Sequence, residues 1–241
     1  MTETLVYQAD GLNMVSRLFV GKGSGRRPGV LVFPEAFGLG EHAISRAQRL
    51  ADLGYVALAC DLHGDGRVIE DLGQVMPLIE PLRETPERIR ARAGGGLAQL
   101  VALPEVDPKR IAAIGFCFGG TMALELARGG ADIAAAIGFH SGLATVAPAA
   151  PNSIKAKILA CIGADDPGIP IDQRAAFEQE MRAAGADWQL HLYGGVVHSF
   201  TNPGAEKLGR PEFARYDAVA DARSWASMMG LFEELSFGNP V

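Results

Sequence analysis

A cysteine set between closely spaced glycines is the feature of this sequence that points most directly to chemistry. Cys117 lies in the stretch Gly115-Phe116-Cys117-Phe118-Gly119-Gly120, after the apolar run Ile111–Ile114 and before a segment with helical spacing of apolar residues. A strand, a sharp turn and a helix in that order form a nucleophile elbow, in which small residues must stand two positions either side of the nucleophile. Gly115 and Gly119 meet that requirement. The pattern therefore predicts that Cys117 is a nucleophile.

The chemistry of a thiol fits this position at the start of a helix. The helix dipole favours the thiolate and so lowers the thiol pKa below its free value of ~8.5. The alternative is that Cys117 is a core residue near a glycine-rich bend, because free cysteine is among the most buried residue types. The elbow alone leaves both interpretations open, and the rest of the chain favours the nucleophile.

Two aspartates compete for the role of the acid that such a nucleophile requires. In elbow enzymes the acid and then the histidine follow the nucleophile along the chain. Asp165 and Asp166 follow the apolar run Ile158–Ile162, where the carboxyl end of a parallel strand would meet the site. The spacing Gly-x-x-Asp from Gly163 favours Asp166, and an aspartate turn before Pro167 is the structural alternative.

Among the five histidines, His198 is the best candidate for the base. It follows the last predicted strand, Trp188–Tyr193, whereas His140, which also follows a strand, is the strongest competitor. In this interpretation Asp166 orients His198, which takes the thiol proton and later protonates the leaving group. The backbone N–H groups of Phe118 and Ala36 are the predicted donors to the tetrahedral oxyanion.

The elements that must position these residues alternate along the chain. Buried strands are predicted at the apolar runs Val30–Phe33, Val56–Ala59, Ile111–Ile114, Ile133–Ile137 and Ile158–Ile162. Helices are predicted over Glu41–Leu53, from Thr85 onward, over Asp172–Ala184 and over about 214–235, and a hairpin over Thr4–Gln8 and Leu12–Gly21. Alternation of this kind predicts one α/β domain over residues 1–241, with a mostly parallel central sheet flanked by helices. Residues 64–84 fit no period and are either a small cap over the site or a plain surface connection.

Composition narrows the class of function. The 241 residues carry a net charge of −6, which argues against nucleic acids and anionic membranes as partners. No secretory signal and no apolar run of membrane-spanning length is visible. The odd number of cysteines, Cys60, Cys117 and Cys161, and the lack of a CxxC pair argue against disulfides or a metal site. We expect a cytoplasmic enzyme with no cofactor and a small-molecule substrate, and the sequence leaves the oligomeric state open.

Taken together, the motifs resemble the dienelactone hydrolase family of α/β-hydrolases over nearly the whole chain. The matching segments are 34–38, 60–62, 115–120, 163–166 and 198–200. The resemblance implies an α/β-hydrolase fold and a triad of Cys117, Asp166 and His198. It also implies that Glu35 holds the resting thiol and swings away when substrate binds. The implied activity is hydrolysis of small carboxylic esters or lactones through an acyl-thioester intermediate.

One departure from the family concerns the substrate. Characterised members carry two arginines that grip the substrate carboxylate, and the matching positions here are Asp65 and Asn202. Arg67 is a candidate replacement, and we expect Phe37, Arg67 and Asn202 to contact substrate. Two other classes of function remain as alternatives: a non-catalytic binding module with this fold, and a thiol redox protein that uses Cys117. No triad member is missing and no second cysteine is close in sequence, so both are less favoured.

Overall fold

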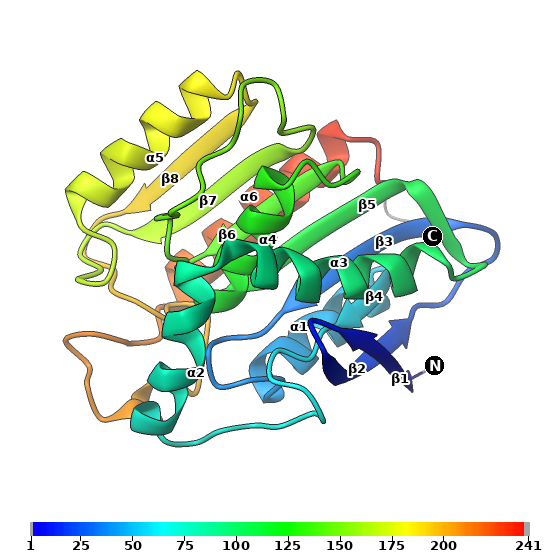
Figure 1. Ribbon diagram of the computed structural model, residues 1–241, viewed down its shortest axis with the longest axis horizontal. Coiled ribbons are helices and arrows are strands. Elements are labelled where there is room, and N and C mark those ends of the chain that lie inside the picture. The colour runs from blue at the N-terminus through cyan, green and yellow to red at the C-terminus, as the bar shows by residue number, and fades with distance from the viewer. Residues whose placement is uncertain (1, 239–241) are drawn as a thin grey trace.

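The apolar runs of the sequence form the middle of an eight-stranded sheet in the computed structural model, which describes residues 2–238 (Figure 1). The strands are β1 (Thr2–Ala9), β2 (Leu12–Val20), β3 (Arg27–Phe33), β4 (Val56–Ala59), β5 (Val106–Phe116), β6 (Ala135–Phe139), β7 (Lys157–Gly163) and β8 (Trp188–Tyr193). Their order across the sheet is β1-β2-β4-β3-β5-β6-β7-β8. Only β1/β2 and β2/β4 pair antiparallel, so the predicted, mostly parallel α/β sheet is confirmed.

Helices cover both faces of the sheet, which is why its inner strands contain continuous apolar runs. The helices are α1 (Glu41–Asp52), α2 (Leu72–Glu84), α3 (Pro86–Val101), α4 (Phe118–Arg128), α5 (Ile171–Ala183) and α6 (Ala218–Glu234), with a 3-10 turn at Ala205–Leu208. One core joins α2, α3, α4 and α5 to one face, and a second core joins α1 and α6 to the other. Within residues 2–238, no helix combines the length and apolar character needed to cross a bilayer.

Several element boundaries differ from the sequence prediction, among them the starts of the last helix and of β6. The last helix starts at Ala218 rather than near 214, because the Asp217 side chain accepts hydrogen bonds from the N–H groups of Val219 and Ala220 and caps the helix there. Strand β6 begins at Ala135 rather than at Ile133, since Ile133 lies in the turn that leads into the strand. The strand has five residues, as predicted, but lies two residues later in the chain.

A helix in the segment 64–84 was not predicted. Asp71 caps α2 by accepting a hydrogen bond from the Gln74 N–H at 3.0 Å. Pro77 and Pro81 stand inside the helix and hid its period, since proline removes a backbone donor. The buried side chains of α2 nevertheless follow a helical spacing: Val75, Ile79 and Leu82.

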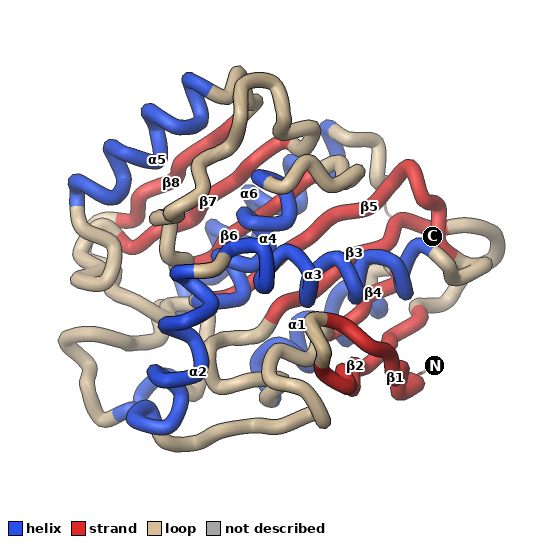
Figure 2. Tube along the Cα trace, in the orientation of Figure 1, coloured by secondary structure: helices blue, strands red, loops and turns tan. Residues whose placement is uncertain are grey.

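The long loops that follow the parallel strands lie on one side of the molecule. Figure 2 shows the connection between β4 and α2 and the connection between β8 and α6 on the same side as α2. Ligands of open α/β sheets bind at the carboxyl ends of the strands. The fold therefore brings the predicted site residues to one edge, from loops far apart in sequence.

Candidate active site

Cys117 stands at a strained turn between β5 and α4. Its φ of 53° and ψ of −119° lie outside the regions that L-residues ordinarily adopt. The flanking glycines leave no room for a side chain: a Cβ on Gly115 would lie 2.0 Å from the Gly119 oxygen, and one on Gly119 would lie 2.3 Å from the Phe33 oxygen. The strand–turn–helix geometry expected of the glycine spacing is thus present, and it projects Cys117 from the end of a central strand.

The loops after β7 and β8 bring Asp166 and His198 together. Asp166 Oδ2 lies 2.6 Å from His198 Nδ1, and both residues are buried. The other Asp166 oxygen accepts a hydrogen bond from the Gly168 N–H at 2.8 Å, which fixes the carboxylate. Asp165 is exposed, although its N–H is bound to the Val196 carbonyl. Of the two aspartates, Asp166 is the one in contact with His198.

The pKa of His198 depends on both the Cys117 thiol and the Asp166 carboxylate. Burial lowers the pKa of His198, but the charge of Cys117 and hydrogen bonds to Asp166 and Cys117 raise it to about 10. Because Asp166 occupies Nδ1, Nε2 is the ring nitrogen left for the thiol. The three groups can therefore form a thiolate–imidazolium pair backed by a carboxylate.

The other two cysteines lie in a different environment. Cys60 and Cys161 are buried, whereas Cys117 is only partly so, and all three thiols are free. Burial raises the pKa of Cys60 and raises that of Cys161 to about 12. Neither is suited to react as a thiolate at neutral pH.

The predicted oxyanion donors are the backbone N–H groups of Phe118 and Ala36. Phe118 is the first residue of α4, so its N–H has no acceptor within the helix. The Cys117 carbonyl accepts from the N–H groups of Gly120 and Thr121, which turns the Phe118 N–H at the other end of that peptide away from the helix. Ala36 lies in the loop after β3, and this loop is fixed by a 2.8 Å hydrogen bond between its carbonyl and His63 Nε2.

Glu35 is held by the loop that carries His198. Ser199 Oγ donates to one carboxylate oxygen at 3.2 Å and Asn202 Nδ2 donates to the other at 2.7 Å. Burial raises the pKa of Glu35, but His42, His198 and the Asn202 amide outweigh burial and hold the pKa below its usual value. The contact with the resting thiol that the family resemblance implied is replaced, in this conformation, by these contacts to Ser199 and Asn202.

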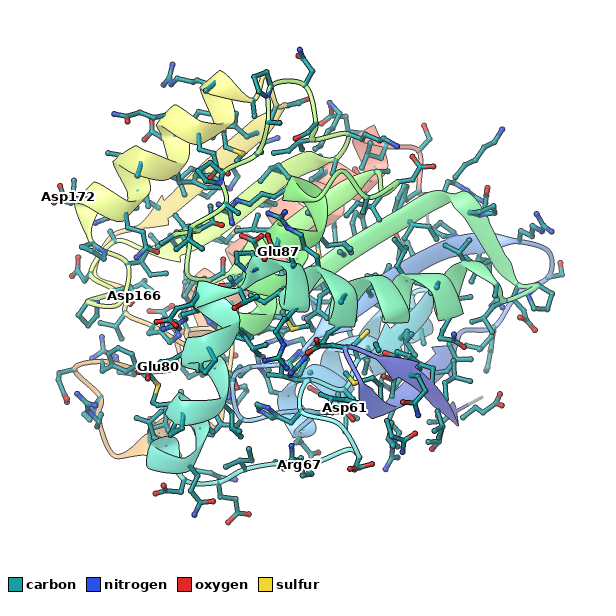
Figure 3. The ribbon with its side chains drawn as sticks, viewed as in Figure 1. Asp61, Arg67, Glu80, Glu87, Asp166 and Asp172 are labelled. Carbon is teal, nitrogen blue, oxygen red and sulfur yellow. The ribbon has the colours of Figure 1, made fainter. Side chains whose placement is uncertain are left out.

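The three predicted substrate contacts lie in different surroundings. Phe37 and Asn202 line a cavity of about 360 Å³ together with Glu35, His42 and Lys207. Asn202 is already engaged there, since its side chain binds Glu35 and the Gly204 N–H. Arg67 is exposed and does not line this cavity, and its guanidinium donates to the His63 carbonyl at 2.7 Å. Figure 3 shows Arg67 on the loop after β4, well apart from Asp166.

Several residues near the site were missed or misjudged in the sequence. The Arg83 guanidinium, in the last turn of α2, lies 5.8 Å from the centre of the Phe118 ring. His140, expected only as a competitor of His198, accepts a hydrogen bond from the Cys117 N–H at 3.2 Å. Thr201 contacts His140, and His42 contacts Thr201, so these side chains lead from His140 toward Glu35. Position after a strand end pointed to His140, and nothing in the spacing pointed to the other residues.

The sheet, the strained elbow and the acid and histidine loops that follow it in the chain define an α/β-hydrolase. The chain belongs to the dienelactone hydrolase family, whose sequence model matches residues 15–236. It is 28% identical over 220 residues to a putative carboxymethylenebutenolidase of Yersinia pestis, a match that covers 88% of this chain and 79% of that protein. These relatives make the chain a hydrolase.

Two solved structures are closely similar. The protein called m3DLH shares 46% identity with a TM-score of 0.91, covering 97% of this chain and 98% of that one. The dienelactone hydrolase-like promiscuous phosphotriesterase P91, from metagenomic libraries, shares 43% identity with a TM-score of 0.90, covering 98% of both chains. The fold is therefore shared along nearly the full length.

Proposed function

We propose that this protein hydrolyses small carboxylic esters or lactones, with Cys117 as nucleophile, His198 as base and Asp166 as the acid that orients it. The observation that carries the proposal is the 2.6 Å contact of His198 with the Asp166 carboxylate beside a strained elbow, where the Cys117 thiol also raises the His198 pKa. The alternatives are less well supported. A binding module needs no such strain, and a redox role lacks an accessible second thiol, since Cys60 and Cys161 are buried.

In the first half of the reaction, the Cys117 thiolate attacks the ester carbonyl carbon and forms a C–S bond. The carbonyl π electrons move to oxygen, where the N–H groups of Phe118 and Ala36 stabilise the oxyanion. Collapse of the intermediate breaks the C–O bond, and the leaving alkoxide takes the proton of His198. A lactone opens in the same way, with the alcohol remaining attached to the acyl group.

In the second half, neutral His198 removes a proton from water as the water oxygen attacks the thioester carbon. The new tetrahedral intermediate expels the Cys117 thiolate and releases the carboxylic acid. His198 is then protonated again and the thiolate–imidazolium pair is restored. No cofactor or metal ion is required for this sequence.

We extend the proposal to residues 64–84, which would act as a small cap over the site. Two contacts support this. Ile69 N–H donates to the Phe37 carbonyl at 2.8 Å, and α2 packs in the same core as Phe118 and Ala36.

The three free thiols are consistent with the cytoplasmic location expected from the sequence.

The phosphotriesterase P91 suggests a second substrate class, because it is 43% identical to this chain over 98% of both chains. A thiolate beside an imidazolium can attack phosphorus as it attacks a carbonyl carbon. Organophosphate triesters therefore belong in the substrate panel as a second candidate.

The test is a panel of p-nitrophenyl esters, lactones, thioesters and phosphotriesters, assayed with the wild-type chain and with Cys117→Ala. We expect the esters and lactones to be turned over and Cys117→Ala to reduce kcat by on the order of 10³-fold or more. Cys60→Ala is the matched control and should stay within about twofold. Activity that survives in Cys117→Ala would overturn the proposal.

A further inference from the structure

A row of hydrogen-bonded side chains runs behind the elbow, outside the three residues proposed to react. His140 follows β6, is fully buried and has a φ of 41°. The Cys117 N–H is shared between the Phe139 carbonyl at 3.0 Å and His140 Nδ1 at 3.2 Å, so Nδ1 accepts and carries no hydrogen. The hydrogen is therefore on Nε2, which lies 2.7 Å from Thr201 Oγ1 and donates to it.

The row continues from Thr201 to Glu35. Thr201 Oγ1 lies 3.3 Å from His42 Nε2, and because the hydroxyl accepts from His140, its own hydrogen is left for His42. The ring hydrogen of His42 is then on Nδ1. That atom is buried without a hydrogen-bond partner and faces Glu35 Oε2 at 3.7 Å. Every donor in the row points the same way, from the backbone of Cys117 toward the Glu35 carboxylate.

The surroundings keep this row in one arrangement. Thr201 is 1% exposed, the His42 ring packs 4.5 Å from the ring of Phe116, and Arg46 donates to the Thr201 carbonyl. Burial and the positive charges of His198 and Arg46 hold the pKa of His140 well below its usual value. Neutral His140 can therefore keep accepting from Cys117, and it also packs edge-on against His198 at 5.2 Å.

The groups that face Glu35 come from α1 and from the loop after β8. His42 lies on α1, and His198, Ser199 and Asn202 lie on the loop after β8. Glu41 and Lys207 line the cavity that Glu35 also lines. Of these, only His42 connects Glu35 to the backbone of Cys117.

We propose that His140, Thr201 and His42 are positioning residues that couple the orientation of Glu35 to that of the Cys117 backbone, with the Thr201 hydroxyl as the central link. The inference rests on the proposed role of Cys117 as nucleophile. With the row intact, His42 presents Nδ1–H to Glu35 and the carboxylate stays ionised and turned toward Ser199 and Asn202. Without the hydroxyl, His42 is free to rotate, and Glu35 can approach the thiolate and oppose it by like charge.

Thr201→Val and Thr201→Ser form a matched pair for the test, because valine keeps the shape and loses the hydroxyl while serine keeps the hydroxyl. The readout is the second-order rate of Cys117 alkylation by iodoacetamide between pH 5 and 9, which needs no substrate. We expect Thr201→Val to slow alkylation at pH 7 about tenfold, as for a lost hydrogen bond worth about 1.4 kcal/mol, and Thr201→Ser to stay within about twofold. Thermal unfolding of both variants measures how far each is destabilised.

The decisive comparison repeats Thr201→Val in a Glu35→Gln chain. If the hydroxyl acts through Glu35, its loss should cost about twofold or less there, and the ratio of the two rates should no longer vary with pH. His42→Phe, which keeps a ring against Phe116, should show the same dependence on Glu35. Equal losses in both backgrounds, or equal rates for the valine and serine variants, would overturn the inference. Hydrolysis that persists in Cys117→Ala would instead overturn the proposed function.

Discussion

At the scale of single residues, the choice between two adjacent aspartates rests on contact. Asp166 lies 2.6 Å from His198 Nδ1, whereas Asp165 is exposed. We expect Asp166→Asn to lower kcat by on the order of 10²-fold or more, because an amide no longer favours the required tautomer of His198. Asp165→Asn is the matched control and should stay within about twofold. Steady-state kinetics on folded variants decide this, and a larger loss in Asp165→Asn would reverse the assignment.

The raised pKa of His198 predicts a change of stability with pH. Its folded pKa is about 10, against roughly 6.5 in an unfolded chain, so the stabilisation is fully present below pH ~6.5 and is lost as the pH rises toward 10. The charge of Cys117 is the main cause that raises the pKa. We therefore expect urea unfolding to show a larger loss of stability from pH 6.5 to 10 in the wild type than in Cys117→Ala. Parallel curves for the two chains would show that the pair does not form.

At the scale of elements, the glycines are of two kinds. Some leave no room for a side chain, and others stand where a side chain would be tolerated. A Cβ on Gly119 would lie 2.3 Å from two backbone oxygens, whereas a Cβ on Gly94, inside α3, meets nothing within 4 Å. We expect Gly119→Ala to destabilise the fold by about 3 kcal/mol or more and to abolish activity. Gly94→Ala should instead stabilise by up to about 1 kcal/mol, from helix propensity. Chemical denaturation measures both, and an active, stable Gly119→Ala would contradict the strained elbow.

Most elements were predictable because their signals are local. Continuous apolar runs gave the parallel strands other than β8, and the spacing of apolar residues gave five of the six helices in the described residues. The exception was α2, where Pro77 and Pro81 masked a helix held by an aspartate cap and by packing against α3. The helical structure of that segment depends on tertiary packing, which the sequence pattern does not show.

At the scale of the whole molecule, the order of motifs along the chain predicted which loops meet. Cys117, Asp166 and His198 follow three different strands, and the parallel sheet brings those strand ends to one edge. The partners of Glu35 could not be predicted in this way, because Ser199, Asn202 and His42 reach it only through side-chain orientation. The role of Glu35 was implied by the family, whereas its observed contacts came only from the structure.

The preference of the site for a charged or a neutral substrate also depends on residues from several parts of the molecule. Asp65 and Asn202 occupy the positions of the family's carboxylate-binding arginines, and Arg67 is engaged by the His63 carbonyl. We expect the methyl ester of a dienelactone carboxylate to be hydrolysed at least as well as the free acid, because Asp65 and Asn202 offer the anion no bidentate cation at those two positions. The comparison is kcat/KM for the two substrates. A strong preference for the acid that is lost in Arg67→Ala or Arg83→Ala would identify the cation responsible.

The central claim is that Cys117 is acylated during turnover, and the most direct test is to trap that intermediate. A slowly hydrolysed p-nitrophenyl ester is mixed with the protein, quenched in acid and measured by intact-protein and peptide mass spectrometry. We predict one acyl group per chain, on the peptide that contains Cys117, formed at the rate of the p-nitrophenol burst and absent in Cys117→Ala. Acylation of another residue, or full turnover with Cys117 alkylated, would contradict this prediction.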